Sequence, residues 1–145
     1  MSSNGQPNND SDATPQTRGS EMILLVDDEL PLRALVRQIL QKHGYRVLEA
    51  ESGRAALALW PQPGGEIDLL LTDVVMPDGM NGRQLATELE ALKPGLKVIY
   101  SSGYGADILG KGFLKEGENF LQKPYSPAKL VQLIRKILDG TAGAK

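Results

Sequence analysis

Four short aliphatic runs recur along the chain, and each one ends in polar residues. A continuous run of this kind is typical of a strand that is buried on both faces of a parallel sheet. The runs, with the residues that follow them, are Ile23–Val26 before Asp27 and Asp28, Leu69–Thr72 before Asp73, Lys97–Tyr100 before Ser101 and Ser102, and Asn119–Gln122 before Lys123 and Pro124.

Between these runs the apolar residues recur with a helical period. In the first such segment they fall at Leu32, Leu35, Val36, Ile39 and Leu40, with Pro31 suited to the first turn and Gly44 to the C-terminal cap. The remaining predicted elements are a strand at Arg46–Ala50, a helix capped by Ser52, a helix at Arg83–Leu92, a helix near Ala106–Lys115, and a last helix capped by Ser126 with Pro127 in its first turn. Five strands alternating with five helices predict one parallel sheet with right-handed crossovers and helices on both faces.

The two ends of the chain differ from this pattern. Residues 1–20 contain only Met1 and Ala13 as apolar side chains, so they are predicted to be a disordered linker or an added tail. Residues 21–140 form the expected domain, and residues 141–145 are expected to fray.

Composition narrows the function class. The chain has 145 residues, a net charge of −2, 41% hydrophobic and 23% charged residues, and no cysteine. The charge gives no reason to expect nucleic-acid binding, and the missing cysteines exclude thiol catalysis and thiolate metal sites. No run approaches the roughly 18 apolar residues of a membrane span, and no signal peptide is visible. We therefore expect a cytoplasmic domain with no membrane contact.

Candidate chemistry follows from where the strands end. In parallel α/β sheets the carboxyl ends of the strands line the ligand crevice, which would bring three carboxylates, a hydroxyl and an ammonium together. Clustered carboxylates repel one another unless a cation is present, and Mg²⁺ favours oxygen ligands. An ionised Asp73 could act as a nucleophile without a general base, because it has no proton to lose. This set predicts a divalent cation and phosphoryl transfer.

The chain resembles the receiver domain of two-component response regulators over about Glu21 to Gly140. The resemblance implies a flavodoxin-like (βα)5 fold, a doubly wound five-stranded parallel sheet with strand order 2-1-3-4-5. It rests on four motifs in order, which are Val26-Asp27-Asp28-Glu29, Thr72-Asp73-Val74-Val75-Met76-Pro77, Ser101-Ser102-Gly103-Tyr104 and Phe120-Leu121-Gln122-Lys123-Pro124.

The resemblance also implies a role for each site residue. Asp73 would accept a phosphoryl group from the phosphohistidine of a histidine kinase or a histidine phosphotransfer domain. The cofactor would be Mg²⁺, with Mn²⁺ as an alternative, held directly by Asp28 and Asp73 and by the backbone carbonyl of Val75, with Asp27 sharing the ion or acting through water. Ser102, rather than Ser101, would bond one phosphoryl oxygen, and Lys123 would pair with another beside a cis peptide to Pro124.

Three further positions are expected to regulate the site. Phe120 occupies the switch position and would turn inward on phosphorylation, although a plain core role is the alternative. Val75 and Tyr104 flank the path of a hydrolytic water and would tune the lifetime of the phosphoryl group. The single histidine, His43, is expected on the surface without a partner and is excluded as a phosphodonor, whereas Tyr45 and Trp60 are expected to pack.

One spacing departs from the family pattern. Gly82 lies nine residues beyond Asp73, where the family usually has eight, so the loop Met76–Gly82 carries one extra residue. With the Ser101-Ser102-Gly103-Tyr104 motif, this loop most resembles receivers attached to hybrid sensor histidine kinases. The protein would not be an enzyme beyond its own phosphotransfer and autodephosphorylation.

Alternative functions stay open at this stage. The chain could be a stand-alone regulator, a relay intermediate or a degenerate receiver used only for binding. A Mg²⁺-dependent phosphohydrolase of the haloacid dehalogenase type is a further alternative, but those enzymes place a second Asp two residues after the nucleophile, where this chain has Val75. The signal, the kinase, the output and the oligomeric state are not encoded in any recognisable motif.

Overall fold

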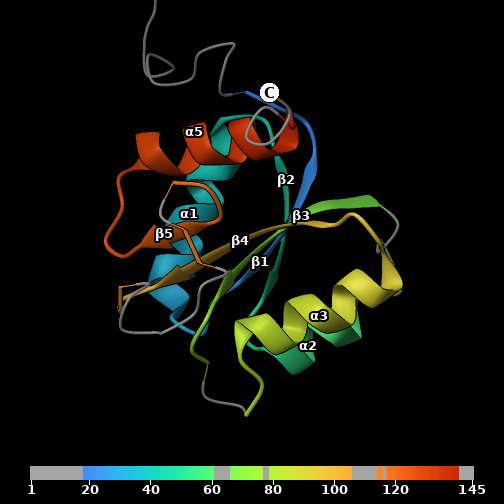
Figure 1. Cartoon of the computed structure of the whole chain (residues 1–145). Coiled ribbons are helices and arrows are strands. Elements are labelled where there is room, and N and C mark those ends of the chain that lie inside the picture. The colour runs from blue at the N-terminus through green and yellow to red at the C-terminus, as the bar shows by residue number, and fades with distance from the viewer. Residues whose placement is uncertain (1–17, 61–65, 77–78, 106–113, 116, 141–145) are drawn as a thin grey trace, which may run out of the picture.

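A computed structural model describes residues 18–60, 66–76, 79–105, 114–115 and 117–140 of the chain. Its five strands form one parallel sheet in the order β2-β1-β3-β4-β5, which confirms the predicted topology (Figure 1). The elements are β1 (Met22–Val26), α1 (Leu30–Lys42), β2 (Arg46–Ala50), α2 (Gly53–Leu59), β3 (Ile67–Asp73), α3 (Gly82–Leu92), β4 (Lys97–Ser102), β5 (Phe120–Gln122) and α5 (Pro127–Leu138).

Helices cover both faces of the sheet, with α1 and α5 on one face and α2 and α3 on the other (Figure 1). Strand β1 shows why both faces are apolar. Leu24 and Val26 pack in the core beneath α2 and α3, whereas Ile23 and Leu25 pack in the core beneath α1 and α5. All five residues of β1 are buried, as expected for a strand at the centre of a parallel sheet.

Polar caps begin α2 and α5 at the positions that the sequence predicts. The Ser52 hydroxyl accepts a hydrogen bond from the Ala55 amide at 3.0 Å, and the Ser126 hydroxyl does the same for Lys129 at 3.0 Å. Each bond satisfies an amide that has no partner inside its helix. At the other end of α1, Gly44 adopts a φ of 96°, a conformation that favours glycine.

Several elements differ from the prediction. Strands β3 and β4 run one or two residues further than expected, so Asp73, Ser101 and Ser102 belong to the strands themselves. Leu35, predicted for the buried stripe of α1, is 53% exposed, which makes that stripe narrower than the pattern suggested. Most of the helix predicted near 106–115 falls outside the described residues. No helix among those described is long and apolar enough to cross a membrane.

The surface position predicted for His43 is wrong. Its side chain is only 2% exposed, and its Nδ1 lies 2.9 Å from the carbonyl oxygen of Ile39, one turn earlier in the chain. The Gly19 amide also donates to the His43 carbonyl at 3.0 Å. The segment that enters the domain therefore lies against the end of α1.

A second polar cluster lies beside the start of β1, where Glu21 directly precedes the strand. We call Arg135, Glu21, Asp139 and Tyr45 the Arg135 cluster. The Arg135 guanidinium pairs with Glu21 at 2.7 Å and with Asp139 at 2.8 Å, and it donates to the Tyr45 hydroxyl at 3.2 Å. It also donates to the Arg18 carbonyl at 3.1 Å, so residue 18 contacts the domain.

Candidate functional site

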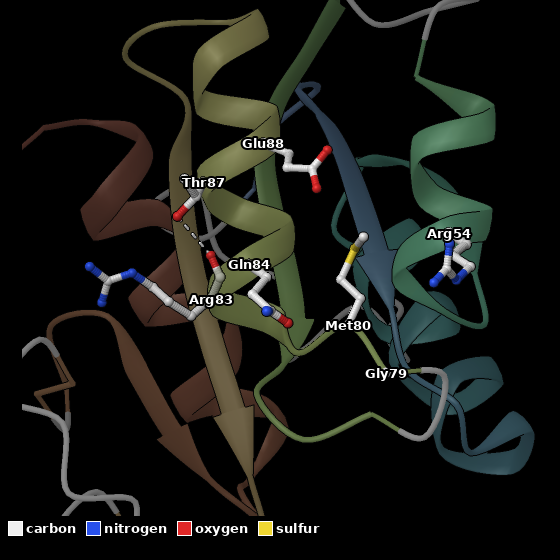
Figure 2. Close-up of a pocket in the computed structure, with 7 residues that line it drawn as sticks. All are labelled: Arg54, Gly79, Met80, Arg83, Gln84, Thr87 and Glu88. Carbon is white, nitrogen blue, oxygen red and sulfur yellow. Dashed lines mark hydrogen bonds between the residues drawn. The ribbon is translucent and has the colours of Figure 1, made fainter.

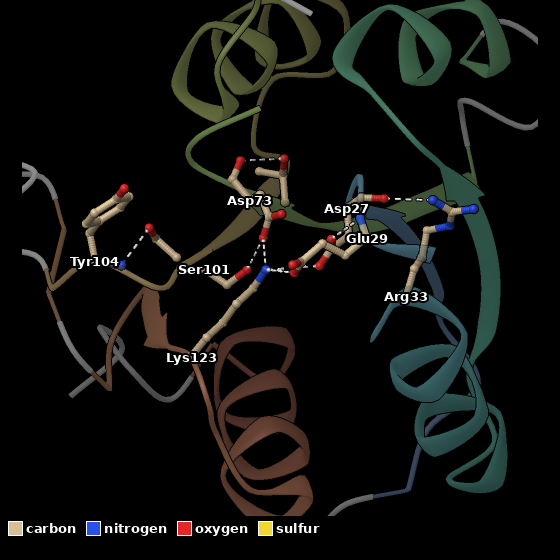
Figure 3. A network of polar contacts seen from close by, with 9 residues as sticks. Asp27, Glu29, Arg33, Asp73, Ser101, Tyr104 and Lys123 are labelled. Carbon is tan, nitrogen blue, oxygen red and sulfur yellow. Dashed lines mark hydrogen bonds and ion pairs between the residues drawn. The ribbon is translucent and has the colours of Figure 1, made fainter. Parts of the chain in front are cut away.

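The candidate site lies at the carboxyl ends of β1, β3 and β4 and in the segment after β5. A hollow of about 190 Å³ opens there. Figure 3 shows that the side chains of Asp27, Asp73 and Lys123 come from three separate elements and point toward one another. The residues that line the hollow are Asp28, Glu29, Asp73, Val75, Ser101, Ser102, Gly103, Tyr104 and Lys123.

Lys123 is the cation of this site. Its Nζ lies 2.9 Å from Asp73 Oδ1, 3.3 Å from Asp27 Oδ2 and 3.4 Å from a Glu29 oxygen. The Lys123 amide donates to the Ser102 carbonyl at 2.8 Å, and the expected cis peptide between Lys123 and Pro124 is confirmed. One ammonium therefore serves carboxylates from the β1–α1 connection and from the end of β3.

The acidic groups outnumber that ammonium. One oxygen from each of Asp27, Asp28 and Asp73 lies within 4.8 Å of the other two, which is close enough to hold a metal ion. Burial, assisted by the Asp27 charge and opposed by the hydrogen bond and charge of Lys123, raises the pKa of Asp73 to about 7. Burial by itself would lower the pKa of Lys123, but the hydrogen bond and charge of Asp73 raise it above its ordinary value. The carboxylates therefore carry more negative charge than the single ammonium balances. The raised pKa keeps that ammonium protonated.

The two serines at the end of β4 contact different groups. Ser101 faces Asp73 across the β3–β4 ladder, and its hydroxyl donates to Asp73 Oδ1 at 2.9 Å. The Ser102 hydroxyl instead accepts a hydrogen bond from the Tyr104 amide at 3.0 Å (Figure 3). Ser102 lines the hollow, and its contact with a phosphoryl oxygen stays a prediction. The motif resemblance pointed to Ser102. The contact between Ser101 and Asp73 could be recognised only from the register of β3 and β4.

The backbone around Asp73 is held by the start of α3. The Gly82 amide donates to the Val74 carbonyl at 2.8 Å, and the Val74 amide donates to the Ser101 carbonyl at 2.9 Å. A Cβ atom on Gly82 would collide with the carbonyl oxygen of Asp73. Glycine is therefore required at this position because the helix begins directly against the backbone of Asp73.

The regulatory positions occupy different environments. Val75 and Tyr104 lie on the rim of the hollow and are 53% and 56% exposed. Phe120 is fully buried in the core on the α2 and α3 face and pairs with Tyr100 of β4, so its side chain already lies inward in this structure. Its role as a switch stays a prediction.

A larger hollow, of about 350 Å³, lies between α2 and α3 (Figure 2). It is lined by Arg54, Gly79, Met80, Arg83, Gln84, Thr87 and Glu88. Of these described lining residues only Glu88 is acidic, and it is exposed. Volume alone would favour this hollow, but the buried and mutually perturbed groups lie in the smaller one, where we place the function.

Comparisons with known proteins agree with the geometry. Residues 23–135 match the response regulator receiver domain family. The chain is 38% identical over 122 residues to the sensor kinase CckA of Brucella abortus, a match that covers 83% of this chain and 13% of that protein. It is 31% identical to the chemotaxis protein CheY of Thermotoga maritima, covering 79% of this chain and 95% of that protein.

A solved structure gives the same result for the fold. The receiver domain of the hybrid histidine kinase CckA superposes with a TM-score of 0.68 at 33% identity, covering 81% of this chain and 98% of that one. The predicted similarity to receivers of hybrid kinases is therefore confirmed. The match to a small part of the whole sensor kinase concerns this domain alone.

Proposed function

The chain belongs to the response regulator receiver domain family, and we propose that Asp73 is its phosphoacceptor, taking a phosphoryl group from a phosphohistidine in a Mg²⁺-dependent reaction. One observation carries this assignment. Among the described residues, the hydrogen bond and the ion pair made by the Asp73 carboxylate both fall on Oδ1, from Ser101 and Lys123. Oδ2 is thereby left available to attack phosphorus.

The donor set of the site fits Mg²⁺. We propose that Asp28, Asp73 and the backbone carbonyl of Val75 hold the ion directly and that Asp27 contributes through water. Both carboxylate oxygens of Asp27 are already engaged, one by the Glu29 amide at 2.8 Å and the other by Lys123 at 3.3 Å. No described residue makes a hydrogen bond or ion pair with the exposed Asp28 carboxylate, so it is free to bind a cation. Bound Mg²⁺ would supply the charge neutralisation that phosphoryl transfer needs.

The other site residues act around this step. Lys123 orients Oδ1 of Asp73 and would pair with a phosphoryl oxygen once the charge moves there. The Ser102 hydroxyl would exchange its bond with the Tyr104 amide for a second phosphoryl oxygen. After transfer, the chain would catalyse its own dephosphorylation, with Val75 and Tyr104 restricting the approach of water.

The phosphodonor in this proposal is a histidine kinase or a histidine phosphotransfer domain. Receiver domains are signalling phosphoacceptors, and the likeness to CckA supports a place in a hybrid kinase. A stand-alone regulator, to which the likeness to CheY points, is the competing context. The complete reading frame would separate these two contexts.

The test of the acceptor is intact mass after incubation with acetyl phosphate and Mg²⁺. We expect one phosphoryl adduct on the native protein, none on Asp73→Asn and none when EDTA replaces Mg²⁺. Asp68→Asn is the matched control, because Asp68 lies on the same strand and its carboxylate only accepts a bond from the Met22 amide at 2.9 Å. An undiminished adduct on Asp73→Asn would place the acceptor elsewhere.

A further inference from the structure

Ser101 contacts the phosphoacceptor, and the sequence resemblance gives it no role of its own. Its hydroxyl is 2.9 Å from Asp73 Oδ1, and its side chain belongs to a residue that is only 3% exposed. The two residues are partners in the β3–β4 ladder, so the backbone fixes their separation. The ladder therefore holds the two backbones at a fixed separation, and the Ser101 hydroxyl can leave Asp73 only by rotating about its single Cα–Cβ bond.

We infer that Ser101 shortens the lifetime of the phosphoryl group by stabilising Asp73 as the leaving carboxylate. This inference rests on the proposed function and concerns a different step, the loss of phosphate. In this role Ser101 is a positioning residue that donates to Asp73 Oδ1, the oxygen that does not bond to phosphorus. Ser102, by contrast, is expected to contact the phosphoryl group itself.

The chemistry follows from which oxygen each group contacts. During phosphorylation a lone pair on Asp73 Oδ2 forms the new O–P bond, the P–N bond of the phosphohistidine breaks, and its electron pair returns to the imidazole. Oδ1 then becomes the neutral carbonyl oxygen of a mixed anhydride. During hydrolysis water attacks phosphorus, the P–Oδ2 bond breaks, and the released electron pair spreads over both carboxylate oxygens, while the proton of the water leaves with inorganic phosphate or solvent.

A hydrogen bond to Oδ1 is thus strongest when the carboxylate is free. Charge-assisted hydrogen bonds are roughly twice as strong as neutral ones. Ser101 therefore stabilises the carboxylate more than the anhydride, and part of that difference is already present in the transition state for hydrolysis. Its effect is to favour dephosphorylation in both rate and equilibrium.

Lys123 does not duplicate this role. Its Nζ contacts Asp27 and Glu29 as well as Asp73, and it ends a long flexible side chain that can follow negative charge onto the phosphoryl oxygens. Ser101 has a single side-chain carbon and cannot follow. In the phosphorylated protein Ser101 is accordingly the donor that remains on Oδ1.

The test measures phosphoryl loss in Mg²⁺ from the full chain, using acetyl phosphate as donor and intact mass as readout. Ser101→Ala should retain its phosphoryl group about threefold longer than the native protein, and Ser101→Thr, which keeps the hydroxyl, should restore the native lifetime. At equilibrium with a phosphohistidine protein, the alanine variant should hold about fivefold more phosphoryl group relative to its free form.

Thr72→Val is the matched control. The Thr72 hydroxyl is equally buried and donates to the backbone carbonyl of Asp73 at 3.0 Å, not to its carboxylate. A general packing effect would change both variants alike, whereas the inference requires that only Ser101→Ala change the lifetime. If the alanine variant does not fold, Ser101→Cys replaces it, because a thiol is a weaker donor and should also lengthen the lifetime.

The outcomes separate the two proposals. A native or shortened lifetime in folded Ser101→Ala, with normal phosphorylation, would overturn the role of Ser101 and leave the acceptor assignment intact. Failure of the native protein to gain any phosphoryl group would overturn both.

Discussion

The candidate site, with Asp27, Asp28, Glu29, Asp73 and Lys123, contains the same kinds of group as the Arg135 cluster. The charges of the two are balanced differently. In the Arg135 cluster one guanidinium faces two carboxylates, a hydroxyl and a backbone carbonyl. In the site, one ammonium faces Asp27, Glu29 and Asp73, with the Asp28 carboxylate close by. The first cluster has enough donors for its acids, and the second does not.

The pKa values of the acids express this difference. The hydrogen bond from Arg135 lowers the pKa of Glu21, although burial opposes it, so folding favours the charged form. Burial, followed by the Asp27 charge, raises the pKa of Asp73 to about 7, so folding favours the neutral form. A fold can therefore be stabilised by one acidic cluster while it carries another whose negative charge calls for a bound cation.

The largest expected effect is on Mg²⁺ affinity. Asp28→Ala should weaken Mg²⁺ binding about 100-fold, because it removes a directly bound carboxylate, and Asp27→Ala about tenfold, because that residue acts through water. Glu21→Gln in the Arg135 cluster should leave the affinity unchanged. Titration followed by NMR or Trp60 fluorescence measures all three, and equal affinities would refute the shared site.

The next effect is on folding stability. Arg135→Met should lower the free energy of unfolding by about 2 kcal/mol, since it removes the guanidinium that pairs with Glu21 and donates to the Tyr45 hydroxyl. Phosphorylation of Asp73 should proceed as in the native protein. Urea unfolding and intact mass give the two readouts, and a phosphorylation defect in a folded variant would show that the two clusters are coupled.

A smaller effect should appear in the pH dependence of the folding stability of the metal-free protein. Its sign is opposite in the two clusters. The pKa of Asp73 rises from 3.8 unfolded to about 7 folded, so its contribution to stability is full below about pH 4 and is lost as the pH rises through 7. The lowered pKa of Glu21 gives a contribution that is present above pH 4.5 and is lost on further acidification.

Two variants isolate these contributions. In EDTA, Asp73→Asn should remove the loss of stability between about pH 4 and 7. Glu21→Gln should remove the loss below pH 4.5 and leave the neutral range alone. Urea unfolding at a series of pH values measures both, and an unchanged profile for Asp73→Asn would mean that folding does not raise the pKa of Asp73.

The smallest effect concerns the rim of the site. Replacing Val75 by Asn and Tyr104 by Glu should speed loss of the phosphoryl group by about threefold, because polar side chains on this exposed rim can orient the attacking water. The decay of the phosphorylated mass measures it. A slower decay would contradict the shielding assigned to the native residues.

How much of this could be predicted depends on the range of the interactions. The aliphatic runs and caps are local, so the strands and the gathering of Asp73 and Lys123 could be predicted from the pattern, whereas the strand order came from the family resemblance. Predicting the hydrogen bond between Ser101 and Asp73 requires the exact ends of β3 and β4. The hydrophobic pattern ended both strands too early. His43 bonds through its carbonyl to Gly19 from an earlier part of the chain, and the Arg135 cluster joins residues more than 100 positions apart in sequence. No local pattern marks either one.

The hydrogen bond between Val74 and Gly82 has a consequence for how this loop can vary in length. It fixes both ends of the connection, because Val74 is held by Ser101 and Gly82 is pressed against Asp73. Lengthening a closed loop costs little, with a doubling worth about 0.6 kcal/mol. We therefore expect a one-residue change of length between these two anchored ends to cost little and to leave the position of the Asp73 carboxylate unchanged.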